Sequence, residues 1–319
     1  MQSASGILGT GLSPYILCLV VGILISLAVL QLQLRYAKIS GSTGILYALT
    51  GIPLGIAGAK LFYALARFGF LHGIYGVEGL FRLRVGEFAF TGAILGVLGA
   101  AWLTARLTRQ KARAVIDAVA PAGMLLIALA RFSEYYTDFG AGAYIYETAL
   151  HFFPFAVPNV YGEWYAAIFM LEGLVALAGF ILLSAKKFPG HISKGDTALL
   201  LFALTQVLLE SLRSETIKWG FVRVQQLSSV AIAAAILVKY GLRLKQNGYP
   251  TKRLLVQAGV YFACIVLCVG VEFALDKTEI PRYISYLAMM AALSAMGLIT
   301  FAHMNRAGVG QGKCAGECL

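Results

Sequence analysis

Residues 12–34 read LSPYILCLVVGILISLAVLQLQL, a stretch without one charged side chain. A helix of about 20 apolar residues is long enough to cross the hydrocarbon core of a bilayer. Similar apolar runs lie at roughly 44–66, 88–105, 115–130, 164–185, 197–213, 224–240, 254–275 and 284–303. These runs are continuous and do not alternate every second residue, which favours helices over the strands of a membrane barrel. The sequence therefore predicts an all-α, polytopic integral membrane helix bundle with about nine transmembrane helices.

The composition of the whole chain supports a lipid environment. The 319 residues are 59% hydrophobic and 13% charged, and the mean hydropathy is +0.78. A soluble domain carries roughly 25% charged residues, so this chain lacks the polar surface that a cytosolic enzyme needs. The net charge of +11 is typical of basic cytoplasmic loops between membrane helices, and we expect no nucleic-acid partner.

The distribution of basic residues predicts the orientation. The loops after the first, third, fifth and seventh runs, together with the C-terminal tail, hold sixteen Lys and Arg residues, and the alternate loops hold nine. Cytoplasmic loops carry the excess of basic residues. The first 34 residues contain no Lys or Arg, so we expect no cleavable signal peptide. The N-terminus is predicted to lie outside and the C-terminus in the cytoplasm.

Several polar side chains fall within or at the ends of the apolar runs, where a charge costs at least ~2.5–3.5 kcal/mol. Arg131 and Glu134 are three residues apart and share one helix face, as an interfacial ion pair or as a phosphate-binding group. Gln206, Glu210 and Arg213 follow one another at spacings of four and three. They form one predicted polar stripe, which is more than helix–helix contact alone requires.

Lys60 lies in the middle of the second run, between Ala59 and Leu61. It is either a snorkelling or internally paired lysine, with Glu172 as a possible partner, or a contact to a lipid headgroup. Gly92 and Gly96 allow close helix packing. The sequence shows no nucleotide-binding loop, nucleophile elbow or metal-ligand pattern, and we predict neither a metal nor another cofactor.

The order and spacing of these motifs resemble the prolipoprotein diacylglyceryl transferase family over about residues 12–240. That family consists of seven-helix inner-membrane enzymes with the N-terminus outside. They move the diacylglyceryl group of phosphatidylglycerol to the lipobox cysteine of a prolipoprotein, without a metal. The segment from Asp117 to Pro121 resembles the run that enters the family's fourth helix, and Arg131 falls on the arginine of its Gly-Arg-x-Gly-Asn signature. Glu134 replaces the asparagine of that signature.

Other positions match only in part. Glu210 and Arg213 resemble the family's Glu-x-x-Arg, with Gln206 in place of an arginine one turn earlier. Gln225 falls on the glutamine of its Gly-Gln-x-Leu-Ser motif. Glu163 resembles the last residue of a His-Pro-x-x-Leu-Tyr-Glu box whose histidine position is Val157.

Two further sets follow from the resemblance. Lys60 replaces a family arginine, and Tyr63 matches the tyrosine after it. Thr91 replaces the histidine of a His-Gly-Gly motif and leaves Gly92. The resemblance thus implies catalytic roles for Arg131, Glu134, Glu210 and Arg213, and substrate-binding roles for Lys60, Tyr63, Thr91, Gly92, Glu163 and Gln206.

The prediction is a seven-helix transferase-like core at 1–240, followed at 241–319 by two additional helices and a short cytoplasmic tail. The expected partners are phosphatidylglycerol, prolipoprotein signal peptides and the bilayer of a bacterial inner membrane. The alternative is a non-catalytic protein of the same scaffold that binds phospholipid or transports a lipid or solute. An interrupted helix pair in two related halves is common in transporters, and the sequence shows none.

The charge distribution makes a testable prediction about topology. Reporter fusions in the 106–114 loop should report the cytoplasm, because this loop contains Arg106, Arg109, Lys111 and Arg113. Fusions near residue 150 should report the outside. An external signal from the 106–114 loop would show that the orientation is wrong.

Overall fold

The computed structural model describes residues 13–316, except 83, 85, 138, 160, 186–187, 215, 220–221 and 278–279. The chain forms two compact units. The first consists of Met1–Ala185 and Leu212–Gln225, and the second of Lys186–Ser211 and Gln226–Leu319. The predicted external N-terminus, residues 1–12, and the last three residues of the predicted tail lie outside the described residues.

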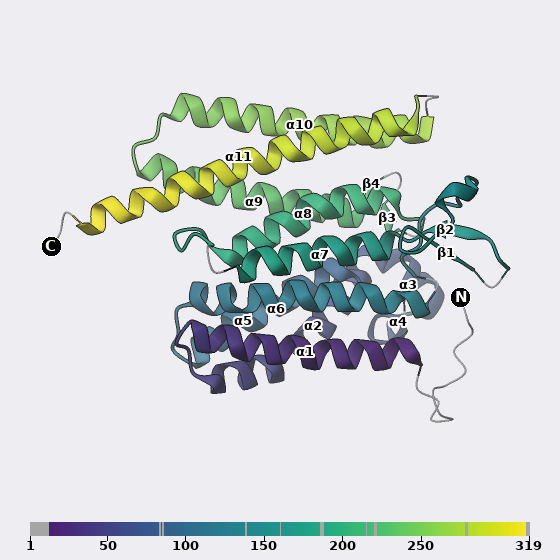
Figure 1. Cartoon of the computed structure of the whole chain (residues 1–319), viewed down its shortest axis with the longest axis horizontal. Coiled ribbons are helices and arrows are strands. Elements are labelled where there is room, and N and C mark those ends of the chain that lie inside the picture. Colours follow the sequence, from purple (N-terminus) through teal and green to yellow (C-terminus); the bar gives the residue numbers. More distant parts are fainter. Residues whose placement is uncertain are drawn as a thin grey trace. The chain divides into compact units, whose positions relative to one another are not determined.

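The first unit contains five long helices (Figure 1). They are α1 (Pro14–Tyr36), α2 (Gly41–Ala66), α5 (Phe90–Leu107), α6 (Ala112–Ser133) and α7 (Ile168–Ser184). Its shorter elements are α3 (Phe68–Tyr75), α4 (Glu78–Phe81), η2 (Glu134–Tyr136), η3 (Thr148–Leu150) and the strands β1 (Ala156–Pro158), β2 (Trp164–Ala166), β3 (Lys218–Trp219) and β4 (Val222–Arg223). The second unit contains most of α8 (Lys194–Leu212) and of α9 (Val224–Gln246), and all of α10 (Thr251–Lys277) and α11 (Arg282–Gly316).

Each of the nine predicted runs contains a helix in the described part of the chain, and the fifth run begins with β2 before α7. Eight of these helices are long and apolar enough to cross a membrane, and α7, with 17 residues, is a shorter apolar helix. The predicted all-α membrane bundle is thereby confirmed, and its orientation stays a prediction. The last helix is longer than expected, because α11 continues through the predicted tail to Gly316.

The segment between the fourth and fifth apolar runs, residues 131–163, contains several short structured elements. Helix α6 continues through Arg131 to Ser133, and η2 follows directly. Farther along, β1 pairs with β2 in an antiparallel hairpin that places Val157 opposite Tyr165. An isolated bridge joins Gly142 to Arg213, so backbone pairing fixes this segment beside the chain that follows α8.

Small residues bring α2 and α5 into backbone contact. A Cβ added at Gly58 would lie 2.5 Å from the carbonyl oxygen of Gly92, and a Cβ at Gly96 would collide with the carbonyl oxygen of Leu54. The predicted packing role of Gly92 and Gly96 is confirmed, because both lie against the α2 backbone. This contact fixes the two helices that carry Tyr63 and Phe90.

Polar contacts link the helices of the second unit. Asp196 of α8 accepts hydrogen bonds from Lys239 Nζ at 2.6 Å and from the Tyr240 hydroxyl at 2.6 Å. Gln226 Nε2 donates to Glu272 Oε1 at 2.7 Å, which joins α9 to α10. The unit therefore groups α8 and α9 with the two additional helices, whereas the predicted division at residue 240 stays a prediction based on the sequence.

The α2–α5 contact predicts different effects for two glycines of the same helix. Gly96→Ala should lower the Tm of the purified protein in detergent, since overpacking costs about 1–3 kcal/mol. Gly99→Ala is the matched control, because a Cβ at Gly99 meets nothing within 4 Å and alanine favours the helix. Equal Tm values for the two variants would contradict this packing.

Candidate functional site

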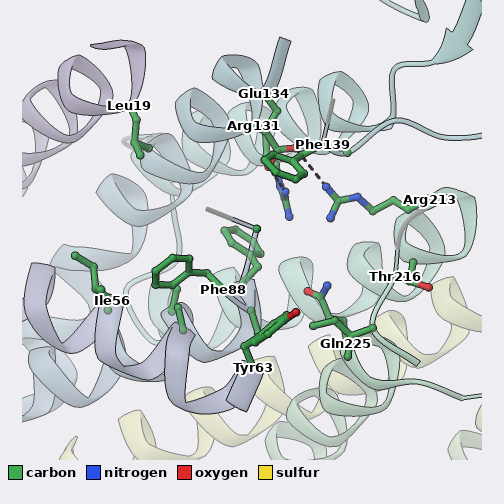
Figure 2. A pocket seen from close by; sticks show the side chains of 18 of the residues that line it. Leu19, Ile56, Tyr63, Phe88, Arg131, Glu134, Phe139, Arg213, Thr216 and Gln225 are labelled. Atoms are coloured by element: carbon green, nitrogen blue, oxygen red, sulfur yellow. Dashed lines mark hydrogen bonds and ion pairs between the residues drawn. The ribbon is translucent and has the colours of Figure 1, made fainter. Parts of the chain in front are cut away.

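A cavity of about 720 Å³ lies within the first unit (Figure 2). Its wall comes from α1, α2, the start of α5, the end of α6, and two segments of chain around residues 134–140 and 213–225. The lining residues are Tyr15, Leu19, Gly55, Ile56, Ala59, Tyr63, Arg67, Gly86, Phe88, Ala89, Phe90, Ala93, Arg131, Glu134, Phe139, Gly140, Arg213, Thr216, Ile217 and Gln225.

The lining is divided between apolar and polar side chains. Leu19, Ile56 and Phe88 lie toward one side in Figure 2, whereas Arg213 and Thr216 lie toward the other. A concave site with an apolar wall and a few convergent polar groups suits a ligand that has an apolar body and a polar head.

The charges of the lining favour an anion. Three arginines, Arg67, Arg131 and Arg213, line the cavity together with one carboxylate, that of Glu134. Guanidinium groups pair with carboxylates and phosphates through parallel hydrogen bonds. The polar part of the cavity is therefore suited to the phosphate or carboxylate of an amphipathic molecule.

Two of these arginines belong to a buried network of four charged residues. Arg131 Nη1 lies 2.5 Å from Glu134 Oε1, and Arg131 Nε lies 2.5 Å from Glu172 Oε2. Arg213 Nη2 lies 3.3 Å from Glu134 Oε2, and Arg213 Nε lies 3.7 Å from Glu172 Oε1. The four side chains are only 4% to 14% exposed. We call this closed set the arginine–glutamate ring.

The end of α6 positions half of the ring. Arg131 lies in the last turn of the helix, and Glu134 begins η2, so the ion pair expected from their spacing is present. The guanidinium of Arg131 also lies 4.3 Å from the ring centroid of Phe90 on α5. This cation–π contact holds the guanidinium plane against the cavity wall.

Backbone pairing positions Arg213. Helix α8 ends at Leu212, and Arg213 forms the bridge with Gly142. Gly140 has a φ of +76°, and a Cβ there would lie 2.8 Å from Arg213 Nη2 and would also collide with Glu134 Oε2. A glycine at position 140 thus leaves room for the ring, and a larger residue would displace both charged groups.

The predicted stripe of Gln206, Glu210 and Arg213 begins on α8 and extends one residue past its end at Leu212. Gln206 and Glu210 lie on α8 in the second unit, where Gln206 Nε2 donates to Glu210 Oε2 at 3.2 Å. Arg213 lies beyond the end of α8 and belongs to the first unit. The structure therefore joins Arg213 to Arg131 and Glu134, while the roles of Gln206 and Glu210 stay predictions.

The partner suggested for Lys60 is wrong. Lys60 Nζ pairs with Glu87 Oε2 at 2.8 Å, and Glu172 contacts the arginines instead. Tyr63, one turn from Lys60, lines the cavity, and its role in substrate binding stays a prediction.

The remaining candidates lie outside the cavity lining. Thr91 is fully buried on α5, and Gly92 packs against α2. Glu163 is exposed in the turn of the β1–β2 hairpin, where it accepts a hydrogen bond from Asn159 at 2.7 Å. Glu163 also accepts from the Tyr165 hydroxyl at 3.1 Å, and this hydrogen bond raises the pKa of Tyr165. Their roles in substrate binding stay predictions.

Sequence reasoning missed three contributors to the site. Glu172 carried a usable signal, because a carboxylate within an apolar run needs a cationic partner, but its sequence position did not identify which one. Arg67 and Tyr15 carried no comparable signal, since both fall near the ends of apolar runs, where arginine and tyrosine are ordinary.

Comparisons with known proteins place the chain in one family. The family model of the prolipoprotein diacylglyceryl transferases matches residues 4–240. A phosphatidylglycerol–prolipoprotein diacylglyceryl transferase of Clostridium kluyveri is 26% identical over 240 residues, which cover 73% of this chain and 92% of the relative. The enzyme of the same name from Listeria monocytogenes is 25% identical over 205 residues, 61% of this chain and 73% of the relative. The chain therefore belongs to the prolipoprotein diacylglyceryl transferase family.

Proposed function

We propose that this protein transfers the diacylglyceryl group of phosphatidylglycerol to the lipobox cysteine of prolipoproteins in the inner membrane of a bacterium. The observation that carries the proposal is the cavity, which combines an apolar wall with Arg131 and Arg213 on one side. The membership of the family and the names of the relatives agree with this activity.

The two arginines bind the phosphate in this proposal. The two arginines and two carboxylates of the ring balance, and Arg67 adds one positive charge to the lining, so a phosphodiester with one negative charge is attracted to the cavity. Tyr63 and Gln225 line the side of the cavity opposite Arg131 (Figure 2). Their hydroxyl and amide groups are suited to the hydroxyls of the glycerol headgroup, and the acyl chains extend along Leu19 and Ile56.

The reaction forms one carbon–sulfur bond and breaks one carbon–oxygen bond. A carboxylate, Glu134 or Glu210, accepts the proton of the cysteine thiol, and the thiolate is the nucleophile. Its sulfur attacks the glyceryl carbon that bears the phosphate, and the bonding electron pair leaves with glycerol phosphate. The phosphate group gains one negative charge in this step. Arg131 and Arg213 stabilise the developing charge, an electrostatic contribution that is often the largest in catalysis.

The alternative, a non-catalytic lipid-binding or transport protein, is not favoured by relatives that are all named as transferases. Complementation of a strain depleted of its own transferase separates the two functions, with lipoprotein mobility as the readout. Restored mobility supports the enzyme, and unchanged mobility despite a correctly inserted protein contradicts it.

Arg131→Ala should weaken binding of phosphatidylglycerol roughly 10- to 100-fold, since a hydrogen bond to a charged group contributes about 1.5–3 kcal/mol. Arg131→Lys should restore little, because a point charge does not replace the planar fork. The measurements are binding of labelled phosphatidylglycerol and formation of the thioether with a lipobox peptide, in detergent.

These two measurements have separate meanings. Binding that depends on Arg131 without any thioether product would leave the phosphate site intact and contradict the transferase. Unchanged binding and turnover in Arg131→Ala would contradict both, and Arg131 would then be an ion-pair residue only.

The choice between the two carboxylates is tested by pH. If Glu134 accepts the thiol proton, Glu134→Gln should react slowly near neutral pH and gain up to about tenfold per pH unit as the thiol, with an ordinary pKa near 8.5, ionises by itself. The same profile in Glu210→Gln would assign the role to Glu210. If both variants keep the wild-type pH profile of kcat, the thiol loses its proton by another route.

A further inference from the structure

Glu172 is the member of the arginine–glutamate ring that does not line the cavity. Its carboxylate contacts the Nε atoms of Arg131 and Arg213, at 2.5 Å and 3.7 Å. The side chain is only 4% exposed. A carboxylate held beside Nε restricts the rotation of each guanidinium group about its side chain.

The local structure of α7 allows this contact. The next residue, Gly173, lies against the ring of Phe132, and a Cβ there would be 2.6 Å from Phe132 Cδ1. Helices α6 and α7 therefore pack closely where Gly173 meets Phe132. The approach lets the short side chain of Glu172 reach Arg131 across the helix interface, and the same carboxylate extends to Arg213.

Only a carboxylate can act as the ionic partner of both arginines. Glu172 Oε2 lies beside Arg131 Nε, and Oε1 lies beside Arg213 Nε. A glutamine has no charge to pair with either arginine, and its NH₂ group would place donor hydrogens beside the N–H group of one of them. The charge balance of the ring also requires a carboxylate at position 172. Two arginines are matched by two carboxylates, so neither cation is buried without a counter-charge.

We infer that Glu172 is a positioning residue that holds Arg131 and Arg213 from behind the cavity wall, so that both guanidinium groups act on one phosphate. The inference rests on the proposed transfer reaction and adds to it the group that orients the two cations. The arginines contact the substrate, and Glu172 acts through them. Its contribution is realised as the leaving phosphate gains charge, when the direction of both donors matters most.

The test measures kcat and KM for phosphatidylglycerol on the full-length protein with a lipobox peptide. Glu172→Gln should lower kcat about 10- to 100-fold without raising KM. The KM is not raised because Arg131 keeps its contacts to Glu134 and Phe90, and because a negative charge that competes with the phosphate is removed. Thermal unfolding of each variant normalises activity to folded protein.

Glu172→Asp separates charge from packing. Aspartate keeps both oxygens and the charge but removes a methylene, whereas glutamine keeps the size and removes the charge. We expect Glu172→Asp to be more active than Glu172→Gln, and the reverse order would overturn the inference. If Glu172→Gln is not recovered in folded form, Glu172→Asp alone decides: a lowered kcat at unchanged KM supports the inference, and wild-type kinetics overturn it.

The matched control is Asp196→Asn, which removes another buried carboxylate that is bonded to a cation, in the second unit. It should leave kcat and KM within about twofold of wild type. A Glu172→Gln variant that resembles this control, less stable but with wild-type kcat, would show that Glu172 has a structural role only.

The wild-type protein distinguishes this inference from the proposed function. Absence of the thioether product in the wild type contradicts the transferase reaction. In that case the binding of phosphatidylglycerol tests the positioning role of Glu172. Binding at least as tight in Glu172→Gln as in the wild type supports the inferred geometry. A loss of binding as large as that in Arg131→Ala would contradict it.

Discussion

Arg131 and Arg213 are buried in the apolar interior of the first unit, and the packing around them must supply carboxylates that neutralise their charges. An unpaired buried charge costs several kcal/mol, and removing one partner of a buried pair destabilises a protein by about 3–5 kcal/mol. Arg131, Glu134, Glu172 and Arg213 meet this requirement together. Their ring ties α6, α7 and the chain after α8 to one another, and the same contacts hold two cations at a cavity.

The ring also explains features of the surrounding backbone. Gly140 makes room for Glu134 and Arg213, and Gly173 brings α7 against Phe132. The bridge between Gly142 and Arg213 fixes the segment that carries one arginine beside the loop after α6. A transferase site requires groups held within a fraction of an ångström of a productive geometry, and rigid helix ends and backbone pairing provide that restraint here.

The family resemblance and the site geometry support different parts of the functional argument. The match over residues 4–240 shows the family, and the cavity gives a physical reason to propose an anionic, amphipathic substrate. One departure from the family's motif has a consequence that the structure shows. Glu134, in place of an asparagine, is an ionic partner of both arginines, so it changes the charge of the site as well as its hydrogen bonding.

The nine apolar helices could be predicted from the sequence, because helix length and hydropathy are local properties that the bilayer requires directly. The pairing of Arg131 with Glu134 could also be predicted, because residues three apart share one helix face. The contacts of Glu172 with the arginines and of Glu87 with Lys60 became apparent only in the folded structure. The folded structure also showed that Arg213 contacts Glu134 and Glu172. These partners lie far apart along the chain, and which carboxylate reaches which cation depends on how closely the helices approach and where each one ends.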